Sequence, residues 1–431
     1  MFSFSEIKNV SYNIKDFGAV VSDMLQTEAI QKALDTCFLN GGGKVIIPFG
    51  IYRTGGLRLR SNTVLYFESG AVLKASTEPE DYFAFKNDNI EPIEEYDTEP
   101  RRSVYPYSRW NNAIIRVINA KNVAIIGEKG SYIDGGDCYD PLGEEDYRGP
   151  HAINVQGCED LYLDGYTITD SANWAHAIFN AKNIEARNLT VFGGHDGFDV
   201  RTCDNVLVED SVFYTGDDCI AGFDNNDVII RNCIFDSACS ALRFGGNNVL
   251  VENCKSYAPS RFGHRYGLTA EQKANRVKTD ATCRHNMENV FNYYCDFRAV
   301  IRKTPGDILI KNCEFYNPDT LLRLDFDGEH IWCCNRSLSS IKFENCKVNG
   351  VCLPLSIIGD EKEPLSVELE NVEITARAGF ENENVIDAVN YSDITFNNVS
   401  INGFSEPSAL LKSEGKVCIT NSTKVRLVKS Y

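Results

Sequence analysis

The chain of 431 residues carries a formal net charge of −18 at pH 7 and contains 16 cysteines. Its acidic surplus repels phosphate groups, so we expect no nucleic-acid partner. No apolar run reaches the length of a membrane span, about 18 residues, so we expect no membrane partner either. The first residues, Met1–Glu6, lack the basic and apolar segments of a secretory signal. We therefore expect a cytoplasmic location, where cysteines stay reduced.

The first predicted element is an amphipathic helix over Thr27–Leu39. Apolar residues recur there at helical spacing, and Gly41–Gly43 ends the pattern. These apolar residues are Ala29, Ile30, Ala33, Leu34 and Phe38. We expect this helix to cap the open N-terminal end of the fold, where it would hide edge strands and the first layer of the core.

Short strands separated by turns account for most of the remaining chain. The first are predicted at Lys44–Pro48, Gly56–Leu59, Thr63–Phe67, Ala113–Val117, Val123–Ile126 and Leu161–Ile168. Later strand–turn–strand blocks are predicted at Ile308–Phe315, Ile341–Val348, Val367–Ile374 and Ile394–Ile401. The tail, Lys416–Tyr431, is predicted to hold one last strand and a frayed end.

A repeat of about 22 residues organises the middle of the chain. Its aliphatic anchors Ile184, Val206, Val228 and Val249 are 22, 22 and 21 residues apart. A fixed period with short strands is typical of a solenoid, in which each repeat is one coil stacked on the last. Residues one period apart then lie about 4.8 Å from each other. We predict an all-β, single-stranded parallel β-helix.

We predict that residues 1–431 form a single domain, because a solenoid grows along one axis without dividing. Residues 12–75 would form the N-terminal cap and the first coils. Two stretches interrupt the pattern and are predicted as loop insertions: 86–112, which is acidic with interleaved aromatic residues, and 257–286, which is basic. The first is either a solvated flap or a wall of the substrate groove.

Two residue types recur at fixed coil positions. Asparagine follows the first strand of seven blocks, at Asn188, Asn232, Asn253, Asn312, Asn345, Asn371 and Asn398. Stacked asparagines can hydrogen-bond to turn amides and to one another, so we interpret them as structural. Cysteine follows asparagine at Cys233, Cys254, Cys313 and Cys346, which we interpret as a stack of small buried side chains.

Three carboxylates should meet on neighbouring coils. Asp196 and Asp218 are 22 residues apart, and Asp217 adjoins Asp218. Crowded like charges raise the pKa of at least one group, which leaves a protonated acid beside an ionised one, as glycoside hydrolysis requires. The alternative is that they are ordinary turn residues, which is how we interpret Asp210 and Asp227.

Metal binding is a further alternative for two clusters. His195 beside the three acids could hold calcium or a transition metal, and His330 with Cys333 and Cys334 could hold zinc. Acids on stiff coils suit calcium poorly, and adjacent cysteines on a strand point to opposite faces. We therefore expect no metal and no cofactor.

Several motifs together resemble glycoside hydrolase family 28, the polygalacturonase family. At the N-terminus they are Ile14–Ala19, Ala29–Ala33 and Gly41–Val45 with Pro48 and Gly50. The family's Asn-Thr-Asp motif falls on Gly194-His195-Asp196, where its aspartate is kept, and its Asp-Asp motif is met by Gly216-Asp217-Asp218-Cys219. The resemblance runs from about residue 12 to residue 254.

This resemblance implies a right-handed parallel β-helix and an inverting hydrolase. Asp217 would be the general acid that protonates the leaving oxygen. Asp196 and Asp218 would position and deprotonate the attacking water. His195 would make the polar contacts of the family's threonine, or it is a satisfied turn histidine.

Two family motifs are altered in this chain. The Gly-His-Gly motif falls on Cys239-Ser240-Ala241, so Ser240 replaces the histidine. The Arg-Ile-Lys motif, which in the family grips a sugar carboxylate, has two poorly spaced candidates, Arg276-Val277-Lys278 and Ile301-Arg302-Lys303.

Arg243 could supply the missing grip. Strand alternation places Leu242 and Phe244 in the core and Arg243 outside, one coil beyond the acids. Basic residues of the second insertion could join it: Arg261, His264, Arg265, Arg276 and Lys278. The alternatives are an ion pair between Arg243 and a neighbouring coil, and a solvated loop for the insertion.

The leading hypothesis is an exo-acting, inverting glycosidase that cleaves α-glycosidic bonds in pectic, uronate-containing oligosaccharides. The alternatives are a hydrolase of the same fold that acts on a neutral α-glycoside, and a non-catalytic carbohydrate-binding β-helix. A polysaccharide lyase is disfavoured because it needs a strong base, usually with calcium, whereas acids dominate here. The sequence leaves the oligomeric state open.

Overall fold

A computed structural model describes residues 2–82, 109–143, 148–265, 283–296, 300–326, 333, 335–379 and 383–431. The chain divides into two compact units. Unit 1 comprises Met1–Asp199, Cys203–Asn205 and Gly263–Cys283, and unit 2 comprises Val200–Thr202, Val206–Phe262 and Arg284–Tyr431. The prediction of a single domain stays a prediction.

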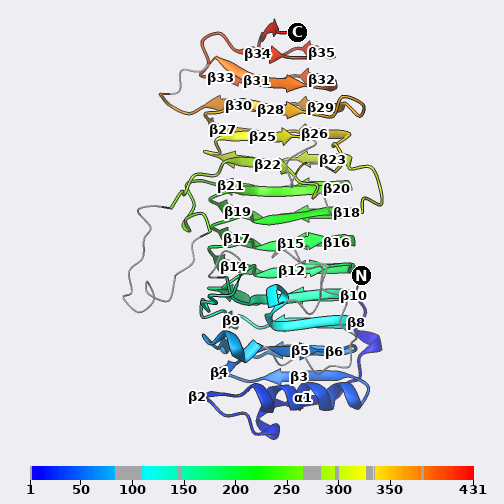
Figure 1. Ribbon diagram of the computed structural model, residues 1–431, viewed down its shortest axis with the longest axis vertical. Helices are drawn as coiled ribbons and strands as arrows, with labels where there is room; N and C mark the ends of the chain where they lie inside the picture. The colour runs from blue at the N-terminus through cyan, green and yellow to red at the C-terminus, as the bar shows by residue number, and fades with distance from the viewer. Residues whose placement is uncertain are drawn as a thin grey trace. The chain divides into compact units, whose positions relative to one another are not determined.

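The helix of unit 1 has the predicted bounds. α1 (Thr27–Leu39) packs against β3 (Gly43–Ile47) and β5 (Leu57–Leu59), as Figure 1 shows. Its buried residues are Ile30, Ala33, Leu34 and Cys37. The predicted place of Phe38 on the apolar face is wrong. Its side chain is 37% exposed, and the centroid of its ring lies 5.2 Å from the Arg60 guanidinium. Cys37 takes that place because it follows Ala33 by four residues and Leu34 by three, on the same helical stripe.

The strands of unit 1 form two parallel sheets. The first contains β1 (Ser11–Asn13), β3, β5, β6 (Thr63–Phe67), β8 (Ala113–Gly127), β10 (His151–Asp164), β12 (His176–Phe179) and β13 (Lys182–Arg187). The second contains β2 (Ser22–Leu25), β4 (Gly50–Thr54), β7 (Ala71–Ala75), β9 (Tyr132–Asp134), β11 (Thr167–Thr169) and β14 (Thr190–Gly193). The described residues of unit 1 also form the short 3₁₀ helices η1 (Phe4–Glu6), η2 (Ile14–Phe17), η3 (Pro79–Tyr82) and η4 (Arg109–Asn111). β15 (Phe198–Arg201) and β16 (Asp204–Glu209) contain residues of both units.

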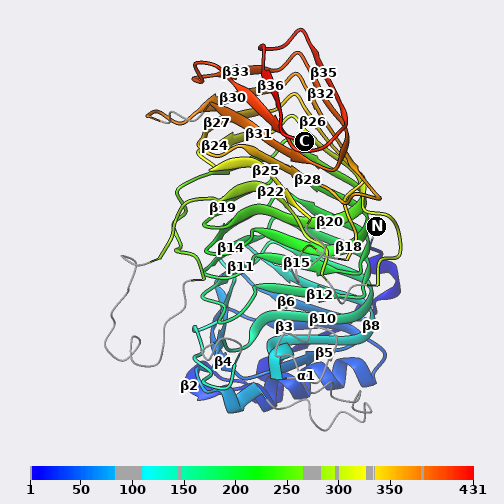
Figure 2. The same cartoon turned by 45° about the horizontal axis from the view of Figure 1, so that its top comes forward.

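Unit 2 repeats this arrangement. Its first sheet contains β18 (Ile220–Arg231), β20 (Ser240–Glu252), β22 (Asn289–Tyr293), β23 (Gly306–Lys311), β25 (Thr320–Asp325), β26 (Ser340–Glu344), β28 (Leu355–Ile358), β29 (Leu365–Glu370), β31 (Asn384–Val389), β32 (Tyr391–Asn397), β34 (Ser408–Leu411), β35 (Lys416–Thr420) and β36 (Arg426–Lys429). Its second contains β17 (Val212–Thr215), β19 (Ile234–Ser237), β21 (Lys255–Tyr257), β24 (Glu314–Tyr316), β27 (Lys347–Val351), β30 (Glu373–Ala376) and β33 (Ser400–Asn402). Figure 2 shows β24, β27, β30 and β33 following one another in that order.

The parallel ladders confirm a mostly β fold built from repeated blocks. The tail differs from its prediction, since it holds two strands: β35 pairs with β32 and β36 pairs with β34. The register within the repeat is also resolved. Ile220 pairs with Leu242, an offset of 22 residues, whereas Val228 pairs with Val249, an offset of 21. The change falls between Gly222 and Asn225, so one coil carries an extra residue as a bulge.

The asparagine stack has the predicted structural role. All seven asparagines adopt positive φ angles, a conformation that asparagine tolerates better than most residues. Their side-chain amides form a ladder: Asn371 donates to Asn345 at 3.0 Å, and Asn398 donates to Asn371 at 2.7 Å. Asp210 and Asp227 also adopt positive φ and accept from such amides, which confirms them as turn residues.

The cysteine stack is buried, as predicted. Cys233, Cys254, Cys313 and Cys346 all lie in the core. Every cysteine in the described part of the chain is a free thiol. No helix among the described residues is long and apolar enough to span a membrane.

Parts of the predicted insertions and of the zinc cluster lie outside the described residues. These parts are residues 86–108 of the first insertion, residues 266–282 of the second, and His330 and Cys334. Cys333 is described, and its thiol donates to the backbone oxygen of Tyr293 at 3.0 Å.

Candidate active site

Asp217 and Asp218 occupy the turn that joins β17 to β18 in unit 2. Hydroxyl groups fix this turn: Thr215 Oγ1 and Ser237 Oγ each donate to the backbone oxygen of Asp217 at 2.7 Å. Ser260 Oγ donates to the backbone oxygen of Thr215 at 3.0 Å. Serine and threonine at strand ends commonly satisfy turn carbonyls in this way. The result is a stiff turn that holds both aspartates in buried positions.

The carboxylate of Asp218 has a different partner at each oxygen. Oδ1 accepts the backbone N–H of Ser240 at 3.1 Å, and Oδ2 lies 3.6 Å from Nη1 of Arg243. Asp218 is 0% exposed. Burial, and then the charge of Asp217, raise the pKa of Asp218 to about 6, against the opposing effects of Arg243, Ser240 and Cys239. A buried carboxyl beside another carboxyl, kept ionisable by one cation, is the arrangement expected of an acid–base pair.

The predicted orientation of Arg243 is confirmed. Leu242 and Phe244 are buried in the core of β20, whereas the Arg243 side chain is 19% exposed. In the register, Arg243 pairs with Ala221 on the preceding coil. The small alanine leaves room for the longer side chain to lean back towards Asp218. Arg243 therefore borders the acids and also makes the ion pair to a neighbouring coil that we considered as its alternative.

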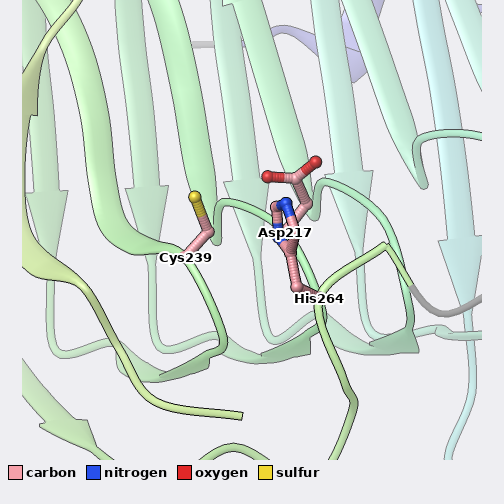
Figure 3. A group of neighbouring side chains, drawn as sticks. All are labelled: Asp217, Cys239 and His264. Atoms are coloured by element: carbon pink, nitrogen blue, oxygen red, sulfur yellow. The ribbon is translucent and has the colours of Figure 1, made fainter. Parts of the chain in front are cut away.

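Ser240 acts on Asp218 through its backbone, a role that the sequence did not indicate. Its side chain is fully buried, and its hydroxyl donates to Cys239 Sγ at 3.9 Å. Its predicted contact with substrate stays a prediction. The side chain of Cys239 lies near that of Asp217 (Figure 3). The sequence indicated Cys239 only as part of an altered motif. Burial and the two aspartates raise the pKa of the Cys239 thiol, so it is neutral.

Tyr294 is a site residue that the sequence analysis missed. Its buried ring lies 4.1 Å from the guanidinium of Arg243. It follows β22, which pairs directly with β20 and places Asn292 beside Arg243. The strand β22, Asn289–Tyr293, contains no arginine or lysine. The coil after Arg243 therefore supplies an aromatic ring and no cation from its strand.

The basic residues of the second insertion have separate positions. In unit 2 the Arg261 guanidinium stacks 4.0 Å from the ring of Tyr214, and its backbone N–H donates to Asp236. His264 and Arg265 are half-buried and belong to unit 1. Arg276 and Lys278 lie outside the described residues. Their gathering around a substrate stays a prediction.

The second Arg-Ile-Lys candidate, Ile301-Arg302-Lys303, pairs with acids of the protein itself. Arg302 donates from its backbone and from Nε to the carboxylate of Asp224, at 2.9 and 2.8 Å. Lys303 lies 3.9 Å from Asp227. Both cations neutralise turn acids of unit 2.

In unit 1, His195 and Asp196 lie between β14 and β15, and both are buried. The backbone oxygen of Asp196 accepts the N–H of Ala175 at 2.9 Å. The predicted stacking of Asp196 on Asp218 stays a prediction.

The acid pair of unit 2 is a poor cation site by itself. Calcium takes about six to eight oxygen ligands. Two buried carboxyl groups offer fewer, and Arg243 already places a positive charge beside Asp218. This arrangement suits proton transfer better than metal binding.

Comparisons with known proteins agree with the motifs. Residues 97–238 match the model of glycosyl hydrolases family 28, a segment that includes Asp196, Asp217 and Asp218. The chain is 28% identical over 225 residues to a probable polygalacturonase of Vitis vinifera, covering 49% of this chain and 44% of that protein. It is 27% identical over 261 residues to an exo-poly-alpha-D-galacturonosidase of Dickeya chrysanthemi, covering 48% and 41%. The chain spans less than half the length of these two relatives.

Among solved structures, the family 28 exopolygalacturonase of Yersinia enterocolitica has a TM-score of 0.68 at 19% identity, covering 95% of this chain and 78% of that one. At this identity the likeness concerns the fold, and the long parallel ladders described above are consistent with it. The segment that matches the family model contains the Asp217–Asp218 motif. The chain is thus similar to polygalacturonases, and its residues 97–238 match glycosyl hydrolases family 28.

Proposed function

We propose that this protein is an exo-acting, inverting hydrolase of α-glycosidic bonds in pectic, uronate-containing oligosaccharides. The observation that carries the proposal is the buried pair Asp217–Asp218, with the carboxylate of Asp218 held by Ser240 and Arg243. The relatives named polygalacturonase and exo-poly-alpha-D-galacturonosidase support a pectic substrate and exo action.

In the proposed reaction Asp217 gives its proton to the leaving glycosidic oxygen while the bond from that oxygen to the anomeric carbon breaks. A water molecule attacks the same carbon from the opposite face. Asp218, with Asp196 as its partner, accepts the proton that the water loses. Burial and the charge of Asp217 raise the pKa of Asp218, and Arg243 opposes this shift by favouring the ionised form that the base needs. The product anomer is inverted.

A uronate substrate needs local positive charge. Its carboxylate would meet Asp217 and Asp218 at a cost of about 1–4 kcal/mol per close contact at surface-like dielectric. Arg243 supplies one cation beside these acids. We propose that His195, Ser240 and the basic residues Arg261, His264, Arg265, Arg276 and Lys278 also contact the substrate.

We further propose that the parallel ladders wind as one right-handed β-helix, with α1 as its N-terminal cap. The fold likeness to the Yersinia enterocolitica enzyme supports this arrangement. In such a helix Asp196 and Asp218 fall one repeat apart on the same column.

A neutral α-glycoside is the second candidate substrate. The absence of arginine and lysine from β22, the strand beside Arg243, favours it. A carboxylated substrate and its neutral counterpart with the same linkage distinguish the two.

Replacing Asp217 by asparagine tests the proposed reaction. The change removes the proton donor with little change of shape, so turnover of an oligogalacturonate should fall by at least about 100-fold. Asp210→Asn is the matched control, since Asp210 is an exposed turn aspartate, and it should keep turnover near normal. Near-normal turnover in Asp217→Asn, or no cleavage of any oligogalacturonate by the unmodified protein, would refute the proposed function.

A further inference from the structure

A second arginine lies near the ring that supports Arg243. The guanidinium of Arg201 is 5.7 Å from the centroid of the Tyr294 ring, and that of Arg243 is 4.1 Å from it. Both distances are within the roughly 6 Å at which a cation is attracted to an aromatic face. Arg201, Arg243 and Tyr294 all belong to unit 2. We call these three residues the arginine–tyrosine cluster.

The cluster is held rigidly by its neighbours. The ring of Phe223 meets that of Tyr294 edge to face at 5.0 Å, and the Arg201 guanidinium lies 5.1 Å from Phe223. The hydroxyl of Tyr294 donates to Oδ2 of the buried Asp296 at 3.3 Å. A ring fixed at its edge and at its hydroxyl keeps both arginines in place, so little side-chain entropy is lost when they bind a ligand.

The cluster begins at the reacting acids. Arg243 contacts Asp218 through Nη1, and Ala221 beside it is too small to separate the two side chains. A guanidinium carries five N–H donors, more than one carboxylate oxygen can accept. Arg201 lies near the same Tyr294 ring, so a second positive charge adjoins that of Arg243. A sugar unit bound next to the acid pair would therefore meet both cations.

The cluster places two guanidinium groups beside one buried ring. Arg243 lowers the pKa of Asp218, against the opposing effects of burial and Asp217. Burying a second arginine, 8% exposed, beside the same ring is costly in a protein core. Guanidinium groups match carboxylates in geometry as well as in charge, because two parallel N–H bonds can reach two oxygens.

We propose that Arg201 and Arg243, supported by Tyr294, form the site that recognises the carboxylate of a uronate unit in the substrate. This inference rests on the proposed function and names the residues that determine its substrate class. In this proposal Arg201 and Arg243 bind the sugar carboxylate, because β22 contains no arginine or lysine that could do so.

The test measures binding apart from catalysis. Calorimetric titration of the Asp217→Asn protein with trigalacturonate and with its fully methyl-esterified form compares a charged ligand with a neutral one of the same linkage. Adding Arg201→Gln should weaken trigalacturonate binding at least about 10-fold and leave the ester within about twofold. Arg201→Lys, which keeps the charge, should retain part of the preference. Arg323→Gln, at an exposed arginine of β25 paired with Asp325, is the matched control and should change neither affinity.

Supporting residues have their own comparison. Tyr294→Phe keeps the ring and should retain the preference for the acid, whereas Tyr294→Leu should lose most of it. Equal weakening for the acid and the ester in Arg201→Gln, no weakening at all, or no binding of trigalacturonate to the Asp217→Asn protein would overturn this inference. Hydrolysis of trigalacturonate by the unmodified protein is scored separately. Binding that depends on the ligand's charge, without hydrolysis, would refute the proposed function but support the carboxylate site. Hydrolysis with equal binding of the acid and the ester would support the proposed function but refute the carboxylate site.

Discussion

Replacing Asp218 by asparagine should stabilise the folded protein at neutral pH, although we assign this residue to catalysis. Asp218 is fully buried, and its pKa in the folded protein is raised to about 6 from an ordinary value of 3.8. Between these values the native state holds a proton that the unfolded chain has released. Stability therefore falls as the pH rises from about 4 to about 6, and the penalty is complete above that range.

The difference between the two pKa values corresponds to about 3 kcal/mol at pH 7. Asparagine carries no charge, so Asp218→Asn should recover part of this energy. It also loses the contact with Arg243, which leaves that guanidinium less well neutralised. We therefore expect the free energy of unfolding to rise by about 1–3 kcal/mol at pH 7.

Equilibrium urea unfolding at pH 7 and at about pH 4 measures this effect. At the lower pH the native Asp218 is already protonated, so the gain should shrink to a few tenths of a kcal/mol. Asp210→Asn, at an exposed turn position with positive φ, is the control and should change stability little at either pH. A stability gain that is absent at pH 7, or equal at both pH values, would refute the assignment of a strained, buried charge to Asp218.

Three further predictions concern catalysis and the scaffold. Proton NMR of the first sugar released should show the inverted anomer, and a retained anomer would make one aspartate a nucleophile. Because Asp218 must be ionised to accept a proton from water, kcat/KM should fall as the pH drops below about 6, and a profile flat to pH 4 would contradict that role. Asn371→Ala should lower the free energy of unfolding by about 1–3 kcal/mol, since alanine tolerates φ +53° poorly and two ladder hydrogen bonds are lost. Asn371→Gly should lose less in the same urea titration, because glycine adopts that φ without strain.

Periodic features could be predicted from the sequence because each depends on local spacing. The bounds of Thr27–Leu39 follow from the helical pattern and the glycines after it. The outward orientation of Arg243 follows from strand alternation within one strand. The burial of the cysteine stack and the turn role of the asparagines follow from their recurrence at one coil position.

The remaining features depend on contacts between residues whose separation in the sequence does not follow the repeat. Between β21 and β22 lies most of the second insertion, so spacing alone does not place Tyr294 beside Arg243. Arg201 reaches the same ring from a strand three coils earlier in the ladder, a contact set by side-chain length. The final strand β36 lacks the asparagine marker that identified the other blocks. Cys37 and Phe38 both fit the helical pattern at the end of α1, so spacing could not show that Cys37 is the buried one.

The bulge between Gly222 and Asn225 separates two halves of one coil. On one side of it the chain keeps an offset of 22 residues, which aligns Ala221 with Arg243, and on the other it keeps 21, which aligns the aliphatic anchors. A residue gained or lost at this point alters the length of the coil without changing how either half pairs with the next coil. The length of this coil can therefore differ here while the strand segments on either side of the bulge each stay in register. A change of length here would still have to preserve the contact of Phe223 with Tyr294 and the pairing of Asp224 with Arg302.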